Sequence, residues 1–267
     1  MKREKFIKPL KQRLLNLFKK NFLNYFYIIF LGAISAYSLP PYNYFIINFF
    51  TFSLFFIFVF NKKKQTLENK LFFKYGWCFG FGYFLLSLYW IAISLTFDQS
   101  FKFFIPVAII LLPAFLAIFY GLILYLFSIF YSKNLVSSFL IFSILFGIIE
   151  FVRGSILTGF PWNLISFSFS SSIYFIQILS FIGTYSFNLI CVSLFTVPAL
   201  FFLRNSKTEI VICFCFILVS VGFLIFGYVK NHNFNSLESV KNSYTIKAIS
   251  SNISLDRFYS KHDELKI

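Results

Sequence analysis

Charged side chains are scarce in this sequence, and acidic ones are the scarcest. Only 12% of the 267 residues are charged, whereas 59% are hydrophobic, and Asp and Glu together number nine. A chain of this length with so few polar residues cannot cover a water-soluble globule with polar surface. The composition therefore excludes an ordinary soluble domain and makes lipid the expected solvent.

Histidine and cysteine are also scarce. The two histidines, His232 and His262, lie in the polar C-terminal segment and form no ligand cluster. All four cysteines fall within apolar stretches, and Cys213 and Cys215, two residues apart, point to different sides of a helix. We therefore expect no metal and no cofactor, and we interpret the cysteines as small apolar residues.

The apolar residues occur in long stretches that predict an all-α polytopic membrane protein. A span of hydrocarbon about 30 Å thick needs about 20 apolar residues in a helix. The stretches predict about seven transmembrane helices, at 22–39, 44–60, 71–95, 103–131, 135–151, 173–203 and 210–229. The fourth and sixth exceed a perpendicular span, so we expect tilt, a kink at Pro113 or Pro198, or protrusion beyond the lipid.

The basic residues predict the orientation of these spans. Eight Lys or Arg precede Phe22 in a basic N-terminus, residues 1–21, and eight more follow in alternate loops. With the N-terminus in the cytoplasm, sixteen basic residues lie inside and only Lys102 and Arg153 lie in short outer loops. The net charge of +15 thus indicates membrane orientation and not nucleic-acid binding. We expect a multi-pass protein of the bacterial inner membrane.

The tail changes character after the membrane domain, residues 22–229. Residues 230–267 are polar and include a β-like run at 244–249. A lone segment of this length is too short to bury a core. We interpret it as the truncated start of a further domain, periplasmic in a Gram-negative cell.

Glu150 and Arg153 are unusual because charged groups at membrane depth are costly. Their spacing of three residues places them on one helix face, where they can pair and lower the cost of burial. A structural ion pair anchoring a helix end is one interpretation. A contact to a lipid head group or substrate is the other.

A helix-breaking stretch follows directly, with Thr158, Gly159, Pro161 and Trp162. Irregular backbone at membrane depth persists only where protein or a water-filled cavity surrounds it. Trp162 is a candidate for lipid or substrate contact, as are Tyr89 and Trp90 at the outer end of the third span. Each of these aromatics also fits an interfacial anchoring belt.

The segment from Glu150 to Trp162 resembles the E-x-x-R-x-x-x-x-T-G-F-P-W signature of apolipoprotein N-acyltransferases. Other segments resemble that family in the same order: Leu31-Gly32 to Pro40, Gly76 to Trp90 with Gly80 and Gly82, and Gln177 followed by Gly183 to Phe187. In the tail, Ala248 to Ile253 resembles the first strand of the family's periplasmic nitrilase-like α/β domain. Ser250-Ser251 departs from the Gln-Gly that usually precedes the Asn-Ile there.

The resemblance implies an enzyme that transfers an acyl chain from a phospholipid to the N-terminal diacylglyceryl-cysteine of an apolipoprotein. In the family a Glu general base, a Lys and a nucleophilic Cys lie in the nitrilase-like domain. No residue here matches them, so we expect the catalytic residues beyond Ile267 and these 267 residues alone to be inactive. A truncated or split reading frame and a fragment of a longer protein both remain open.

The rival interpretation is a non-enzymatic membrane protein, either a transporter or a lipid-binding scaffold. A transporter usually carries ionisable groups near mid-membrane and broken helices in corresponding halves. Here the spans hold scattered Ser, Asn, Gln and Thr, with no internal repeat. The oligomeric state is not predicted.

Overall fold

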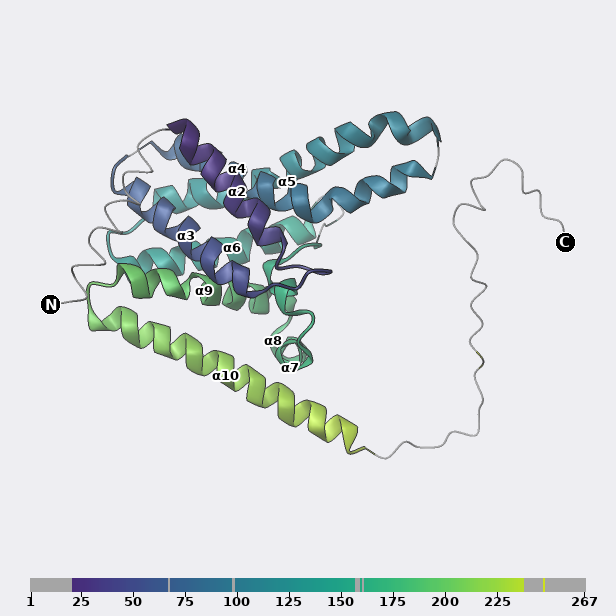
Figure 1. The fold of residues 1–267 in the computed structure, drawn as a ribbon. Helices are drawn as coiled ribbons and strands as arrows, with labels where there is room; N and C mark the ends of the chain where they lie inside the picture. The colour runs from purple at the N-terminus through teal and green to yellow at the C-terminus, as the bar shows by residue number, and fades with distance from the viewer. Residues whose placement is uncertain are drawn as a thin grey trace.

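The computed structural model describes residues 21–66, 68–97, 99–156, 159, 161–237 and 247. All regular structure in these residues is helical (Figure 1). With 3-10 helices labelled η, the order is α2 (Asn21–Ala36), α3 (Ile46–Lys63), α4 (Asn69–Leu88), η1 (Tyr89–Thr96), η2 (Gln99–Phe104), α5 (Ile105–Phe130), α6 (Leu135–Ser155), η3 (Ile165–Phe169), α7 (Ile173–Ile176), α8 (Leu179–Ile182), α9 (Thr184–Leu203) and α10 (Lys207–Asn235). The β-like run at 244–249 lies outside the described residues except for Lys247, so its strand stays a prediction.

Six helical segments are long and apolar enough to cross a membrane, which makes this a multi-pass membrane protein. They are Ile46–Lys63, Asn69–Thr96, Gln99–Phe130, Leu135–Ser155, Thr184–Leu203 and Lys207–Asn235. The first of the seven predicted spans corresponds to α2, whose apolar part Phe22–Ala36 is shorter. A crossing by α2 therefore stays a prediction.

The sixth predicted span differs from the observed chain. We expected one helix over 173–203, but the structure has two short helices, α7 and α8, before the crossing helix α9. Gly183 separates α8 from α9 with a φ of 77°, a left-handed conformation that glycine adopts without steric cost. Apolar composition alone did not reveal this break.

The third and fourth spans continue past their α-helices into η1 and η2. Together with the first turns of α5, these segments form an arm that projects from the bundle (Figure 1). Exposed apolar side chains line the arm, including Ile93, Phe103 and Ile110. The long fourth stretch thus leaves the bundle at its N-terminal end, while tilt, a kink at Pro113 and protrusion beyond the lipid stay predictions.

Glycine allows α4 to pack closely between α2 and α5. A Cβ on Gly82 would lie 2.1 Å from the carbonyl oxygen of Ile29 in α2. A Cβ on Gly76 would lie 2.1 Å from the carbonyl oxygen of Tyr120 in α5. The glycines of the Gly76 to Trp90 segment thus fix the position of the outer end of α4, where Tyr89 and Trp90 follow.

A buried hydrogen-bond cluster ties η3 to the start of the bundle. The Asn48 amide nitrogen in α3 donates to the hydroxyls of Ser38, at 2.8 Å, and Ser168, at 2.9 Å. Ser35 in α2 donates to the Asn48 side-chain oxygen at 2.6 Å. All four side chains are buried, and each polar group has a partner, so burial carries little penalty.

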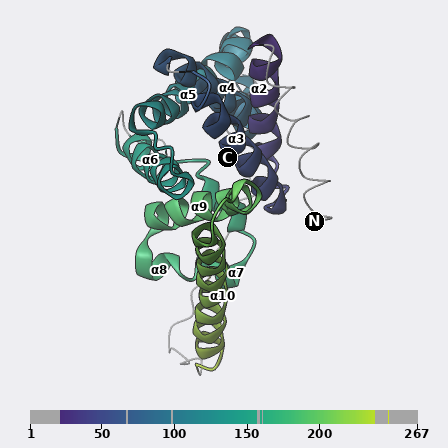
Figure 2. The same cartoon turned by 90° about the vertical axis from the view of Figure 1, so that its left-hand side faces the viewer.

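The last helix, α10, lies largely apart from the others. It begins with a capping box in which Ser206 and Glu209 satisfy each other's backbone N–H groups. It packs against α7 and α9, and Figure 2 shows it directed away from the remaining helices. Its outward side chains are apolar, among them Phe214, Ile217 and Ile225, which suits a helix that faces lipid.

Candidate functional site

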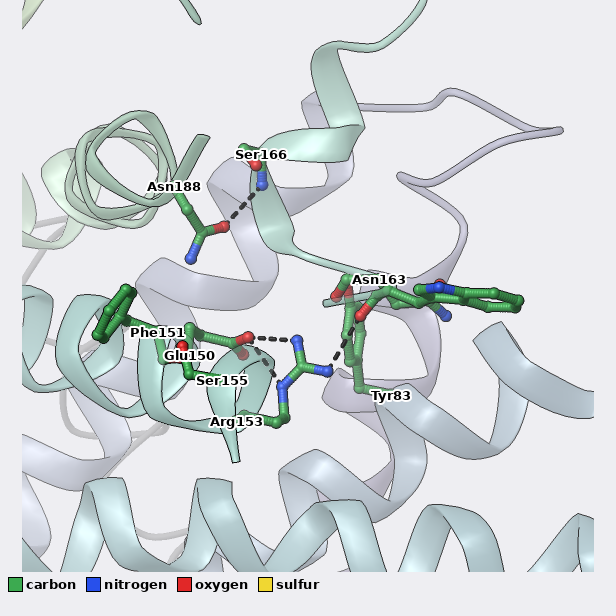
Figure 3. A network of polar contacts seen from close by, with 9 residues as sticks. Tyr83, Glu150, Phe151, Arg153, Ser155, Asn163, Ser166 and Asn188 are labelled. Atoms are coloured by element: carbon green, nitrogen blue, oxygen red, sulfur yellow. Dashed lines mark hydrogen bonds and ion pairs between the residues drawn. The ribbon is translucent and has the colours of Figure 1, made fainter. Parts of the chain in front are cut away.

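Glu150 and Arg153 form a buried ion pair near the C-terminal end of α6. Each side chain is 1% exposed. The Arg153 Nε donates to Glu150 Oε2 at 2.9 Å, and Nη2 donates to the same oxygen (Figure 3). The pairing expected from the three-residue spacing is therefore present, and it offsets part of the cost of burying two charges.

The guanidinium of Arg153 makes two further contacts that use its planar shape. It lies over the ring of Phe84, with 5.3 Å between Cζ and the ring centroid. Its Nη1 donates to the backbone carbonyl oxygen of Trp162 at 3.0 Å. One side chain of α6 thus joins the ion pair to α4 and to the loop that follows α6.

The loop after α6 is held at two successive carbonyl groups. Arg153 holds the carbonyl of Trp162, and the Tyr83 hydroxyl of α4 donates to the carbonyl of Asn163 at 3.0 Å. The Asn163 amide in turn donates to the carbonyl of Ser87 at 3.0 Å. Asn163 has a φ of 56°, a conformation that Asn tolerates better than most residues. Side chains of α4 and α6 therefore fix the backbone on the far side of the helix break.

Sequence reasoning missed Tyr83, Phe84, Ser87 and Asn163 as parts of this site. Two signals were available: Asn163 follows Trp162 directly, and the other three lie in the segment Gly76 to Trp90. Neither signal states which carbonyl group a tyrosine holds. That information depends on the packing of α4 beside the loop.

The structure describes only some of the helix-breaking residues. Gly159 has a φ of 77° and donates its N–H to the carbonyl of Ile156 at 2.8 Å. Pro161 is exposed. Thr158 lies outside the described residues, so its candidate role stays a prediction.

Trp162 stacks on Trp90, which brings two of the predicted aromatics together. Their ring centroids are 5.4 Å apart and their planes differ by 9°. Both rings are about half exposed, and the Trp90 indole N–H donates to the Ser87 carbonyl at 3.0 Å. Two flat apolar surfaces thus lie at the junction of α4, η1 and the loop.

Tyr89 lies elsewhere, although it precedes Trp90 in sequence. It lines a separate small pocket of about 70 Å³ with Tyr37 and Tyr42. The neighbouring Tyr89 hydroxyl raises the pKa of Tyr42 above its usual value, which favours the protonated phenol. The structure therefore does not bring Tyr89 into the group formed by Trp90 and Trp162.

Two pockets meet at Trp90. The larger has a volume of about 490 Å³ and a lining that is almost entirely apolar: Trp90, Ile91, Ile93, Ser94, Phe97, Leu112 and Trp162. The second has a volume of about 360 Å³ and a more polar lining: Leu39, Pro40, Ser87, Trp90, Asn163, Phe167 and Ser170. Pockets of this size, apolar with a few polar groups, suit amphiphilic ligands.

A second polar group of the bundle lies level with the ion pair. Gly154 contacts Tyr185 and Gly147 contacts Leu189, so Asn188 of α9 is near the depth of Glu150 in α6. The Asn188 side-chain oxygen accepts from the Ser166 N–H at 2.9 Å (Figure 3). Asn188 thereby fixes the start of η3, which follows the Trp162 loop.

None of the four cysteines lines either pocket at Trp90. Cys78, Cys191 and Cys213 are buried within helices, and Cys215 is exposed on α10. In the described residues the site combines a restrained loop, a tryptophan pair and apolar pockets. This arrangement can bind and orient an apolar ligand.

Comparison with known proteins finds relatives of this chain. The family model for the apolipoprotein N-acyltransferase N-terminal domain matches residues 31–197. Curated proteins named apolipoprotein N-acyltransferase are similar to this chain: that of Rhizobium etli is 34% identical over 200 residues, 72% of this chain and 37% of the relative. That of Rickettsia typhi is 35% identical over 202 residues, 75% of this chain and 39% of the relative. That of Agrobacterium fabrum is 34% identical over 175 residues, 63% of this chain and 33% of the relative. The matched part of the chain thus covers 33% to 39% of the length of these relatives.

Proposed function

Because this chain belongs to the apolipoprotein N-acyltransferase family, we propose that it is the membrane part of an enzyme of lipoprotein maturation. That enzyme transfers an acyl chain from a phospholipid to the N-terminal diacylglyceryl-cysteine of lipoproteins. The acyl donor is a membrane phospholipid, and the acceptor is a diacylated apolipoprotein. Both substrates are amphiphiles that reach the protein from the lipid phase.

The observation that carries this proposal is the apolar pocket beside the Trp90–Trp162 stack. Its volume of about 490 Å³ and its lining suit a hydrocarbon chain and offer almost no hydrogen-bonding groups. A neighbouring pocket of more polar lining shares Trp90 and includes Ser87 and Asn163. An amphiphile with its chain in one pocket and its polar part toward the other would meet complementary surfaces in both.

The residues of the site have two proposed roles, contact with the substrate and positioning of the loop. Trp90 and Trp162 contact the substrate, whereas Glu150 and Arg153 act through the Trp162 carbonyl as positioning residues. Gly159 and Pro161 shape the loop, and Thr158 belongs to the same segment. The interfacial-belt role remains the alternative for Tyr89, which lines a different pocket.

The proposed location is the bacterial inner membrane, with residues 1–21 in the cytoplasm and residues 230–267 in the periplasm. With α2 counted, residues 22–229 contain seven spans. An odd number of spans places the two ends of the chain on opposite sides of the membrane. The distribution of basic residues supports this orientation, because eight of the twelve basic residues that the structure describes lie at the end of the bundle away from Trp162. The site then faces the periplasmic leaflet.

The chemistry belongs to a nitrilase-like domain that the tail would begin. In the family, a Glu serves as general base, a Lys stabilises the oxyanion and a Cys forms a thioester. No cysteine of this chain suits that role: three are buried in helices and Cys215 lies on α10. The 267 residues alone would therefore bind lipid without transferring its acyl chain.

The coding sequence downstream of Ile267 tests this proposal. We expect a continuation that encodes Trp-Pro-Glu and, further on, a Lys and a Cys in a nitrilase-like domain. A continuation of a different kind, such as further spans without these residues, would contradict the enzyme and favour a non-enzymatic transporter or scaffold. If a stop codon follows Ile267, the neighbouring reading frames are searched for the same residues, because a split gene would encode them there.

A further inference from the structure

Three turns at one end of the bundle concentrate positive charge. The α3–α4, α5–α6 and α9–α10 turns lie together at the left in Figure 1, and Figure 2 looks onto this end. We call it the basic end, and its eight basic residues are Lys62, Lys63, Lys64, Lys70, Lys74, Lys133, Arg204 and Lys207. Its described acidic residues are Glu68 and Glu209.

Some of these charges have structural partners within the protein. Lys63 is buried, donates to the Asn69 side-chain oxygen at 2.7 Å and lies over the Phe72 ring. Arg204 donates to the Phe201 carbonyl at 2.8 Å. Glu209 accepts from the Ser206 N–H at 2.8 Å as part of the α10 cap. Glu209 is therefore engaged in the cap of α10, and it forms no ion pair with the described lysines.

Four lysines of the basic end are exposed and have no polar partner among the described residues: Lys70, Lys74, Lys133 and Lys207. Lys70 and Lys74 are one helical turn apart on α4, so their side chains share a face and repel each other. Close packing of Gly121 in α5 against Phe73 in α4 brings the end of α5, and then Lys133, to the same edge. An anion at this edge would relieve the repulsion.

Exposed apolar side chains occur at the same end of the bundle, and Phe130 and Val211 are three and four residues from Lys133 and Lys207 in the chain. Phe130 at the end of α5 is 59% exposed, Phe201 near the end of α9 is 52% exposed, and Val211 in the first turns of α10 is 58% exposed. Apolar side chains exposed to this degree suit the hydrocarbon region of a bilayer. Lysines at their border can extend their ammonium groups into the layer of lipid head groups.

From this juxtaposition we infer that the basic end is a binding surface for anionic phospholipids. The ammonium groups of Lys70, Lys74, Lys133 and Lys207 contact phosphate and other anionic head-group oxygens, while the acyl chains lie along Phe130, Phe201 and Val211. The surface selects head-group charge, so phosphatidylglycerol binds better than phosphatidylcholine with the same chains. It lies at the opposite end of the bundle from Trp162, and it does not depend on the proposed enzymatic function.

Native mass spectrometry of the 267-residue chain in an uncharged detergent tests this inference. Phosphatidylglycerol and phosphatidylcholine with identical acyl chains are titrated against the parent and two double variants. We expect preferential binding of phosphatidylglycerol that weakens as salt is raised. Lys70→Gln/Lys74→Gln should weaken that binding by about fivefold for each lysine that meets a head group. The control, Lys102→Gln/Lys230→Gln, removes the same charge at the other end and should bind as the parent does.

Equal binding of the two lipids by the parent would overturn the inference, and so would an equal loss in the control variant. Competition by soluble glycerophosphoglycerol, which has the head group without acyl chains, distinguishes a head-group site from a lipid-binding surface. If it competes fully with the lipid, the acyl chains contribute nothing and the lipid assignment is wrong. Should the α4 variant fail to fold, Lys133→Gln/Lys207→Gln, with changes in a turn and a first helical position, provides the same comparison.

Discussion

Arg153 shows how one buried side chain can define a site. Its guanidinium pairs with Glu150, lies over Phe84 and holds the Trp162 carbonyl. A lysine would supply the charge but not the planar set of donors that makes these contacts together. The stability of the outer end of α6 and the conformation of the loop therefore depend on the same group.

Arg153→Ala should destabilise the protein strongly. It leaves the Glu150 carboxylate buried without its counter-charge, which costs about 3 to 5 kcal/mol at such depth. The double variant Glu150→Ala/Arg153→Ala removes both charges and should lose less stability than Arg153→Ala alone. Thermal unfolding in detergent measures both, and a double variant as unstable as the sum of the two single changes would argue against a coupled pair.

The residue patterns predicted the pair but not its connections. A spacing of three on a helix was enough to expect Glu150 beside Arg153. The bond from Arg153 to Trp162 and the bond from Tyr83 to Asn163 join residues that only the packing of α4, α6 and the loop brings together. The tryptophan stack is similar, since Trp90 and Trp162 belong to separate segments.

At the scale of elements, close packing decides what the apolar pattern leaves open. Apolar stretches predicted where most spans lie, because length and hydropathy are properties of single segments. The break at Gly183 and the projecting arm depend on local conformation and on which segments find partners. The crossing by α2 and the strand at 244–249 stay predictions.

Gly82→Ala tests the close contact of α2 and α4. The new Cβ would lie 2.1 Å from the Ile29 carbonyl oxygen, so the two helices must separate. We expect a loss of about 1 to 3 kcal/mol in the free energy of unfolding, as for overpacking elsewhere. Gly222→Ala in α10 is the matched control, because nothing lies within 4 Å of its Cβ position. Equal melting temperatures for the two variants would show that the helices are not in this contact.

At the scale of the whole molecule, the exposed lysines and the candidate site lie at opposite ends of the bundle. The basic end carries exposed lysines, while the tryptophan pair, the pockets and the projecting arm lie at the other. The relatives are named for acyl transfer to apolipoproteins, and the end with the apolar pockets is the one that we propose for this substrate. The proposed orientation places the pockets at the periplasmic leaflet.

Reporter fusions test the orientation directly. Fusions after Lys64 or Arg204 should report a cytoplasmic location, and fusions after Thr96 or Lys230 a periplasmic one. The expectation follows from sixteen basic residues on the inner side against two in the short outer loops. A cytoplasmic signal from the Lys230 fusion would mean that a span has been miscounted, and it would contradict the periplasmic placement of the tail.

Supplying the 267 residues alone to cells depleted of the acyltransferase should not restore triacylated lipoproteins. The physical reason is that the family's nucleophile is a cysteine, and the four cysteines here lie within helices, with Cys78, Cys191 and Cys213 buried and Cys215 on α10. Mass spectrometry of a lipoprotein from these cells provides the measurement. A third acyl chain there would mean that the chain carries a nucleophile of its own.

The central claim is that this membrane domain, through the Trp162 loop, supports acyl transfer. The most direct measurement joins the chain to the remaining part of the Rhizobium etli relative and follows transfer to a diacylated lipoprotein by mass spectrometry. We predict that the parent chimera adds a third acyl chain, and that Trp162→Ala lowers the rate while its expression and melting temperature stay near the parent's. Undiminished transfer by Trp162→Ala would contradict the role of the loop, and a stable chimera without transfer would contradict the role of the domain.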